Sequence, residues 1–118
     1  MTATLPTTAI GAVEVRDAAT VLLVRDGDRG LEVAMLRRRL ESGFVPGAYV
    51  FPGGAVDAED RDLRWADRCD GHDDPSASAA LGLGAGGLAF WVAAVRECFE
   101  EAGLLLARRS DGAPLGVD

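Results

Sequence analysis

Three glutamates crowded into five residues are the feature of this sequence best suited to chemistry. Glu97, Glu100 and Glu101 stand at positions i, i+3 and i+4, which on a helix places their side chains within an arc of roughly 100°. Crowded carboxylates repel one another, and near the C-terminal end of a helix they also oppose the helix dipole. A bound cation would relieve both effects, and Mg²⁺ or Mn²⁺ prefers such oxygen ligands. The cluster therefore predicts a metal site that could bridge to substrate phosphates.

An amphipathic helix is expected to carry this cluster. Four apolar residues repeat at spacings of four, three and four, which predicts one helix face directed at the core. They are Leu88, Val92, Val95 and Phe99. Gly103 follows at the position where a glycine commonly ends a helix. The glutamates lie mostly away from the apolar face, which leaves them available for binding.

Strands are predicted on both sides of this helix. Residues 18–24 form an apolar, β-branched run, residues 31–35 alternate, and turn-forming residues lie between them, so a β-hairpin is expected. A short extended piece at 49–51 runs into Pro52-Gly53-Gly54, where the chain is expected to turn. After the helix, the apolar run Leu104–Ala107 suits a buried strand.

The stretch between the two glycines and the helix has an unusual composition. Residues 57–74 are rich in Asp, which is typical of a solvated, acidic surface segment, with a short helix expected at 61–68. Residues 79–87 are small and predict a linker or a weak helix.

Two segments resemble a known motif, the Nudix box. Residues 96–104 read Arg-Glu-Cys-Phe-Glu-Glu-Ala-Gly-Leu and match the R-E-U-x-E-E-x-G-U segment that ends the box, where U is apolar. Residues 51–54, Phe-Pro-Gly-Gly, are similar to the strand and glycines that begin it. The resemblance to the Nudix hydrolase family implies an α/β fold, an α/β/α sandwich with a mixed β-sheet.

The box is interrupted. In the usual spacing, G-x5-E-x7-R-E, the acidic position counted from Gly54 is Asp60, which we prefer to Glu59, the position counted from Gly53. Between Asp60 and Arg96 lie 35 residues where the box has seven, an insertion of 28 that occupies about 61–87. An interrupted box of this kind resembles the Nudix branch that includes peroxisomal coenzyme A diphosphatase.

The resemblance implies hydrolysis of a nucleoside diphosphate linked to another group, X, with Mg²⁺ or Mn²⁺ as cofactor. The implied metal ligands are Glu97, Glu100, Glu101 and the Gly53 backbone carbonyl. Glu100 and Glu101 are also the expected catalytic residues, and Arg96 is expected to orient the glutamates through charge-assisted hydrogen bonds. Asp60, the acidic box residue, is expected either to add a further metal ligand or to hold the loop in place.

Candidates for the substrate side lie upstream. The expected partner is a small nucleoside diphosphate derivative, with coenzyme A or an acyl-coenzyme A as one candidate. The residues expected to bind it are Arg37, Arg39, Phe51 and Gly54. Three consecutive arginines at a strand end equally suit a solvated, edge-protecting role.

Length and charge exclude other classes. The chain of 118 residues has room for one domain; we expect a flexible arm at 1–15 and a Nudix domain at 16–118. The net charge of −7 disfavours nucleic acid as a partner. The uncharged stretch at 75–95 contains four glycines and suits a core helix better than a membrane span. With Cys69 and Cys98 in unlike contexts and no secretory signal, a cytoplasmic location with free thiols is expected.

The domain is expected to be incomplete at its C-terminus, because only fourteen residues follow Leu104 while the Nudix sheet needs further strands and a helix. An acidic residue from the later half, acting as base or extra ligand, would then be missing. Alternatives are therefore a noncatalytic nucleotide-binding Nudix-like module, an inactive fragment of a longer hydrolase, or an interaction protein with an exposed acidic helix. The insertion is expected either to gate the site or to pair with a second subunit in a homodimer.

Overall fold

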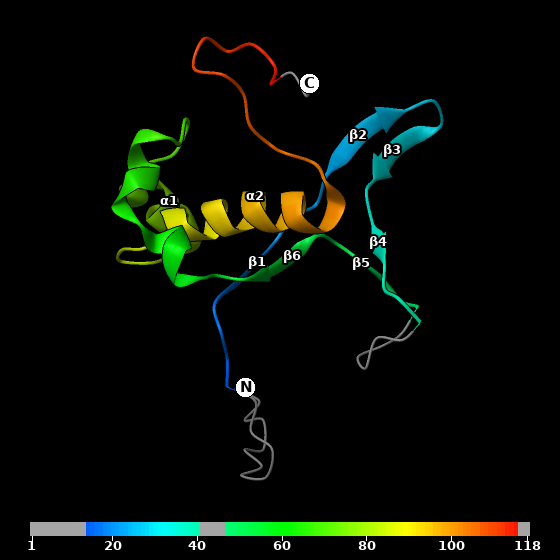
Figure 1. Ribbon diagram of the computed structural model, residues 1–118, viewed down its shortest axis with the longest axis horizontal. Helices are drawn as coiled ribbons and strands as arrows, with labels where there is room; N and C mark the ends of the chain where they lie inside the picture. Colours follow the sequence, from blue (N-terminus) through cyan, green and yellow to red (C-terminus); the bar gives the residue numbers. More distant parts are fainter. Residues whose placement is uncertain (1–13, 41–46, 116–118) are drawn as a thin grey trace, which may run out of the picture.

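A computed structural model describes residues 14–40 and 47–115 of the chain. Within these residues there are six short strands, two 3₁₀ helices and two α-helices (Figure 1). They are β1 (Ala18–Thr20), β2 (Val24–Gly27), β3 (Gly30–Val33), β4 (Leu36–Arg37), β5 (Tyr49–Val50), β6 (Gly53–Ala55), η1 (Ala58–Arg61), η2 (Leu63–Asp67), α1 (Asp74–Leu81) and α2 (Leu88–Ala102). The predicted N-terminal arm lies, except for residues 14 and 15, outside the described residues.

The predicted β-hairpin is present. Strands β2 and β3 pair antiparallel, with Val24 opposite Val33 and Gly27 opposite Gly30 at the turn. Gly30 has a φ of 120°, a conformation that favours glycine. Of the apolar run at 18–24, only Val24 belongs to the hairpin, because residues 18–20 form β1, which pairs with β6.

Strand β1 pairs with β6, which makes a strand of the glycines where a turn was expected. The pairing is antiparallel, with Ala19 opposite Gly54 and Thr20 opposite Gly53. A Cβ on Gly53 would lie 2.4 Å from the backbone oxygen of Ala19, so this close approach of two strands requires glycine. The chain does bend at Pro52, within the segment where a turn was expected, but Gly53 and Gly54 continue as a strand because glycine here permits close backbone contact.

Strands β4 and β5 form a third antiparallel pair, with Leu36 opposite Val50 and Arg37 opposite Tyr49. Figure 1 shows this pair running away from α2, while β1 and β6 pass beneath the helix. In the described residues the strands make three separate two-stranded sheets. The α/β character is confirmed, but the expected sandwich around one mixed sheet is formed only in part.

Helix α2 confirms the prediction from apolar spacing. It ends at Gly103, whose φ of 69° is the left-handed conformation of a helix-ending glycine. Leu88 and Val92 are buried, and Cys98 is fully buried. Phe99 is 52% exposed, however, so the described part of the chain covers only about half of the last residue of the predicted apolar face.

The acidic stretch 57–74 is largely exposed, as predicted, apart from the buried Asp60, whereas the helix that follows it packs against α2. Helix α1 begins at Asp74, before the weak helix expected at 79–87, and its Ala77 is fully buried. Ala77 joins Leu88 and Val92 in the core, with Trp91 packed against them. The short helix expected at 61–68 corresponds to two 3₁₀ segments, η1 and η2.

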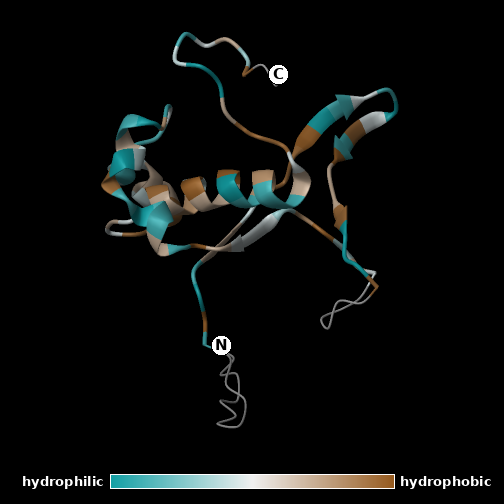
Figure 2. Ribbon diagram, in the orientation of Figure 1, coloured by the Kyte–Doolittle hydropathy of each residue, from teal (hydrophilic) through white to brown (hydrophobic). Residues whose placement is uncertain are grey.

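The apolar run after α2 is not the buried strand that its composition predicted. Leu104, Leu105 and Leu106 are all exposed and have no strand assignment, and Figure 2 shows this hydrophobic segment leaving the end of the helix. A strand needs a neighbour to pair with, and none of the described strands pairs with this run. In the described ranges no helix has the length and apolar character needed to cross a membrane.

Candidate functional site

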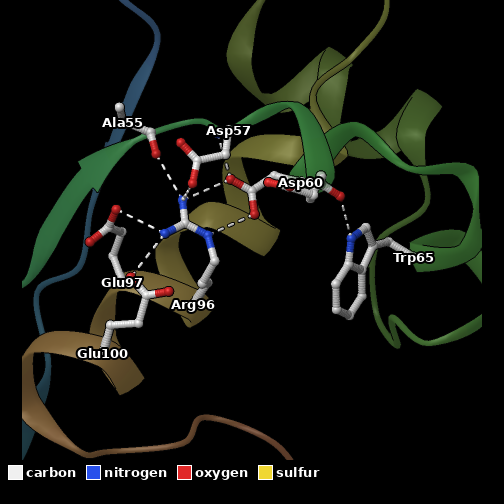
Figure 3. Close-up of polar contacts among 8 residues, drawn as sticks. Ala55, Asp57, Asp60, Trp65, Arg96, Glu97 and Glu100 are labelled. Carbon is white, nitrogen blue, oxygen red and sulfur yellow. Dashed lines mark hydrogen bonds and ion pairs between the residues drawn. The ribbon is translucent and has the colours of Figure 1, made fainter.

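Arg96 lies at the centre of the candidate site and joins α2 to the loop that follows β6 (Figure 3). Its Nε and Nη2 atoms donate to the two carboxylate oxygens of Asp60 at 2.9 and 2.8 Å. Nη2 also donates to the backbone oxygen of Ala55 at 2.9 Å. On the other side, Nη1 donates to Glu97 at 3.0 Å and to Glu100 at 3.1 Å. One guanidinium thus fixes the loop and two of the three glutamates, as the resemblance implied for Arg96.

Asp60 is the buried partner in this arrangement. Asp60 is only 3% exposed. Its carboxylate also accepts a hydrogen bond from the backbone N–H of Asp57 at 2.7 Å. Burial by itself would raise the pKa of Asp60, but the hydrogen bonds from Arg96 and Asp57 and the nearby positive charge outweigh it and hold the pKa below its ordinary value. The hydrogen bond with Asp60 is the main reason that the pKa of Arg96 is raised. Of the two readings left open, the structure places Asp60 where it holds the loop.

Glu97 and Glu101 form a crowded carboxylate pair facing β6. The Glu97 side chain is 15% exposed, and a Cβ on Gly54 would lie 2.4 Å from its Oε1. Burial raises the pKa of Glu101 above its ordinary value, and hydrogen bonding to Glu97 and repulsion from its charge add to this. The backbone N–H of Gly53 and the positive charge of Arg38 act in the opposite direction. Gly54 therefore leaves room for Glu97 directly against the strand, and Gly53 holds Glu101 through its backbone N–H.

The donor set of this pair fits a hard divalent cation. Among residues 14–40 and 47–115, no three His, Cys, Asp or Glu side chains are already gathered as a metal site. The Glu97 and Glu101 carboxylates nevertheless lie close together and repel each other. A cation bound between them would remove this repulsion. Glu100 points to Arg96 and is 54% exposed. That the Gly53 carbonyl is a ligand stays a prediction.

A cleft of about 430 Å³ opens beside Glu101. Its other lining residues are Leu36, Arg37, Arg38, Val50, Phe51 and Gly53. A neighbouring cleft of about 480 Å³ shares four of these residues and reaches Gly54. The guanidinium of Arg37 lies 6.0 Å from the centre of the Tyr49 ring. The Glu101 carboxylate and two arginines therefore meet along one hollow, which is suited to a metal-bound anionic ligand.

The structure separates the residues predicted for the substrate side. Arg37, Phe51 and Gly54 line the clefts, whereas Arg39, which is described, lines neither. Arg38 lines both clefts, although of the three arginines only Arg37 and Arg39 were expected to bind substrate. Nothing in a run of three arginines distinguishes them; only the pairing of β4 with β5 sets which side chains face the hollow.

Two further residues of the site were underestimated from the sequence. Asp57 lies 3.4 Å from Arg96 and was read as part of a solvated acidic segment. Asp60 was placed at the acidic box position, with its role left open between adding a ligand and holding the loop. The spacing from Gly54 was the available signal for Asp60, and its burial could not be read from a stretch in which most neighbours are charged.

Comparison with known proteins gives relatives of one kind. No family model matches the chain. It is 37% identical to the acyl-coenzyme A diphosphatase NUDT19 of Gallus gallus over 77% of this chain and 32% of that protein. It is 33% identical to the Homo sapiens protein of the same name, over 72% of this chain and 29% of that protein. The chain thus spans about a third of the length of these curated relatives.

A solved structure resembles the fold. The crystal structure of a NUDIX hydrolase from Alicyclobacillus acidocaldarius aligns with a TM-score of 0.64 and 33% sequence identity. The alignment covers 91% of this chain and 46% of the solved chain. Nearly all of the present chain therefore matches about half of that molecule.

Proposed function

Because the chain belongs to the Nudix hydrolase family, we propose that it forms the carboxylate-bearing part of a divalent-metal-dependent hydrolase. The bond cleaved is the diphosphate linkage of a nucleoside diphosphate joined to a group X. The observation that carries the proposal is the crowded pair of Glu97 and Glu101, of which Glu101 lines a cleft together with Arg37 and Arg38. The names of the relatives point to coenzyme A or an acyl-coenzyme A as substrate.

Each residue of the site has a distinct part in this reaction. When bound, Mg²⁺ or Mn²⁺ would neutralise the diphosphate and polarise the attacking water. Glu97 and Glu101 would hold the cation, and Glu100, more exposed than Glu97, would complete the ligand set or orient the water. Arg96 keeps the two glutamates that it contacts directed toward one side of α2. Water adds to one phosphorus as its bond to the bridging oxygen breaks, which yields a nucleoside monophosphate and a phosphorylated X.

The cleft arginines bind the substrate in this proposal. Arg37 and Arg38 face the same hollow as Glu101, so an anionic group can lie between the bound cation and the guanidinium groups. A guanidinium can donate two parallel hydrogen bonds to a phosphate, which fixes its orientation. Tyr49, beside Arg37, adds an exposed ring at the mouth of the hollow.

A noncatalytic nucleotide-binding module is the second candidate, and one observation favours it. The alignment to the solved hydrolase covers only 46% of that chain, so a catalytic base outside the matching part would be missing from these 118 residues. In that case the chain binds metal and nucleotide but does not cleave. An interaction protein with an exposed acidic helix is disfavoured, because Glu97 is largely buried and bonded to Arg96.

Product release from a substrate panel tests the proposal. Coenzyme A, an acyl-coenzyme A, ADP-ribose and NADH are each incubated with the chain and Mg²⁺ or Mn²⁺. The matched variants are Glu100→Gln/Glu101→Gln in the site and Glu59→Gln, an exposed glutamate of η1. Metal-dependent cleavage that the double variant loses and Glu59→Gln keeps is the expected result. Metal and nucleotide binding without cleavage would favour the binding module, and equal behaviour of both variants would refute the assigned site.

A further inference from the structure

The N-terminus of α2 is capped by side chains of the insertion. Gly87, the residue before the helix, has no side chain to cap it, so the first backbone N–H groups need other acceptors. The two Asp74 carboxylate oxygens accept from Gly86 at 3.0 Å and from Leu88 at 3.1 Å. The Ser78 hydroxyl accepts from Gly87 at 2.8 Å. Asp74 and Ser78, which we call the insertion cap, thus satisfy three consecutive N–H groups.

The insertion cap is held rigidly. Ser78 is 1% exposed and its neighbour Ala77 is fully buried against α2. A Cβ on Gly87 would lie 2.3 Å from the Ser78 backbone nitrogen, so α1 touches the start of α2 with no room for a side chain. The Asp74 carboxylate also lies at the positive end of the α2 dipole, where a negative charge is favourable. This contact is a fixed joint between two helices.

A second joint lies further along the same helix. Arg96 is bonded to Asp60 in the loop after β6, eight residues beyond Leu88, or about 12 Å along the axis. A helix that is anchored at one position can change its direction, whereas a helix that is anchored at two positions cannot. Glu97 and Glu101 follow the second joint, so their placement against β6 depends on both.

We infer that Asp74 and Ser78 are positioning residues, through which the insertion that interrupts the box sets the direction of α2 and places its glutamates against β6. The insertion then contributes to the geometry of the site and is not merely a loop next to it. The role of the glutamates as metal ligands rests on the proposed function. The position of α2 does not depend on the proposed function, so the positioning role and the proposed function can be tested separately.

Asp74→Asn and Ser78→Ala test the inference in the 118-residue chain, with Asp73→Asn as control. Asn at 74 keeps the size of the side chain but replaces one accepting oxygen with a donor. Asp73, one residue earlier, accepts from Ser76 within the insertion and caps α1, so its variant makes the same charge change one residue away from the contact with α2. Far-ultraviolet circular dichroism at low temperature first establishes that each variant is folded.

Amide and guanidinium NMR signals provide the readouts. We expect the Leu88 amide to exchange about fivefold faster in Asp74→Asn, as for loss of a helix cap. We also expect the Arg96 Nε–H and Gly54 amide signals, remote from the cap, to shift in both cap variants and to stay unchanged in Asp73→Asn. Unchanged Leu88 exchange, or faster exchange with unmoved Arg96 and Gly54 signals, would overturn the inference.

A Mn²⁺ titration of the same proteins separates the inference from the proposed function. If the wild-type chain binds Mn²⁺, we expect about threefold weaker binding in Asp74→Asn than in Asp73→Asn, from displaced carboxylates. Equal affinities would contradict the positioning role. If the wild-type chain binds no Mn²⁺, the proposed function fails, and the Arg96 and Gly54 signals still decide whether the insertion cap positions α2.

Discussion

Replacing Asp60 by Asn is the sharpest perturbation of the site scaffold. The change removes the charge that accepts two hydrogen bonds from Arg96 and leaves that guanidinium partly buried beside an amide. Breaking a buried ion pair on one side costs about 3–5 kcal/mol. Arg96 keeps the Ala55 oxygen and two glutamates as partners, so we expect a loss near the lower end, about 3 kcal/mol of unfolding free energy.

Urea unfolding followed by circular dichroism at pH 7 measures this loss. The matched control is Asp17→Asn, because Asp17 makes an ion pair with Arg61 at 2.8 Å, the same length as the pair of Asp60 and Arg96. Both partners of that control pair are exposed, so Asp17→Asn should lower the unfolding free energy by no more than about 1 kcal/mol. Equal losses in the two variants would refute the account of Asp60 as the buried anchor.

The same pair predicts a dependence of stability on pH. The pKa of Asp60 is lowered in the folded chain, so the folded state binds this proton less readily than the unfolded state. The stabilisation is therefore complete above the ordinary Asp pKa of about 3.9 and is lost as the pH falls through the lowered folded value. We expect the stability difference between wild type and Asp60→Asn to narrow between pH 7 and about 3. A difference that grows on acidification would contradict the assignment.

Three further changes probe the carboxylate pair and the cleft. Glu101→Gln should raise the thermal midpoint slightly, because it removes a crowded charge, and should abolish the further rise that Mn²⁺ gives the wild type; calorimetry with and without Mn²⁺ checks both. Gly54→Ala should cost about 1–3 kcal/mol, since its Cβ would lie 2.4 Å from a carboxylate oxygen, whereas Gly84→Ala, with open space around it, serves as the control in urea unfolding. Arg37→Ala should raise the KM for a diphosphate substrate about fivefold with little change in kcat. Arg39→Ala, which changes a residue outside the clefts, should leave KM unaltered. An equal rise of KM in both variants would contradict the placement of the cleft.

The parts of the fold that the sequence predicted are those that local chemistry determines. The apolar spacing along residues 88–99 and the glycine at 103 were sufficient to define α2. The hairpin at 24–33 followed from alternation around a turn. The start of α1 carried an equally local signal, an Asp cap at Asp73 followed by Pro75, and the high charge of its surroundings led us to overlook it.

The parts that were missed depend on residues far apart in the chain. Asp60 is buried only because Arg96, 36 positions later, reaches it across the insertion. The strand at Gly53 and Gly54 exists because β1 and Glu97 press against opposite sides of the glycines. A local pattern cannot distinguish a glycine that turns the chain from one that permits close contact. The sequence identified the three glutamates and Arg96, but the insertion that positions their helix became visible only in three dimensions.

Direct titration with Mn²⁺, followed by electron paramagnetic resonance of the free ion, tests the central claim that Glu97 and Glu101 form a divalent-cation site. The proteins compared are the wild-type chain, Glu97→Gln/Glu101→Gln, and Glu59→Gln as the control with one exposed glutamate replaced. We expect saturable binding by the wild type and the control, weakened by at least about tenfold in the double variant. Binding of equal strength in all three proteins, or none in the wild type, would contradict the claim.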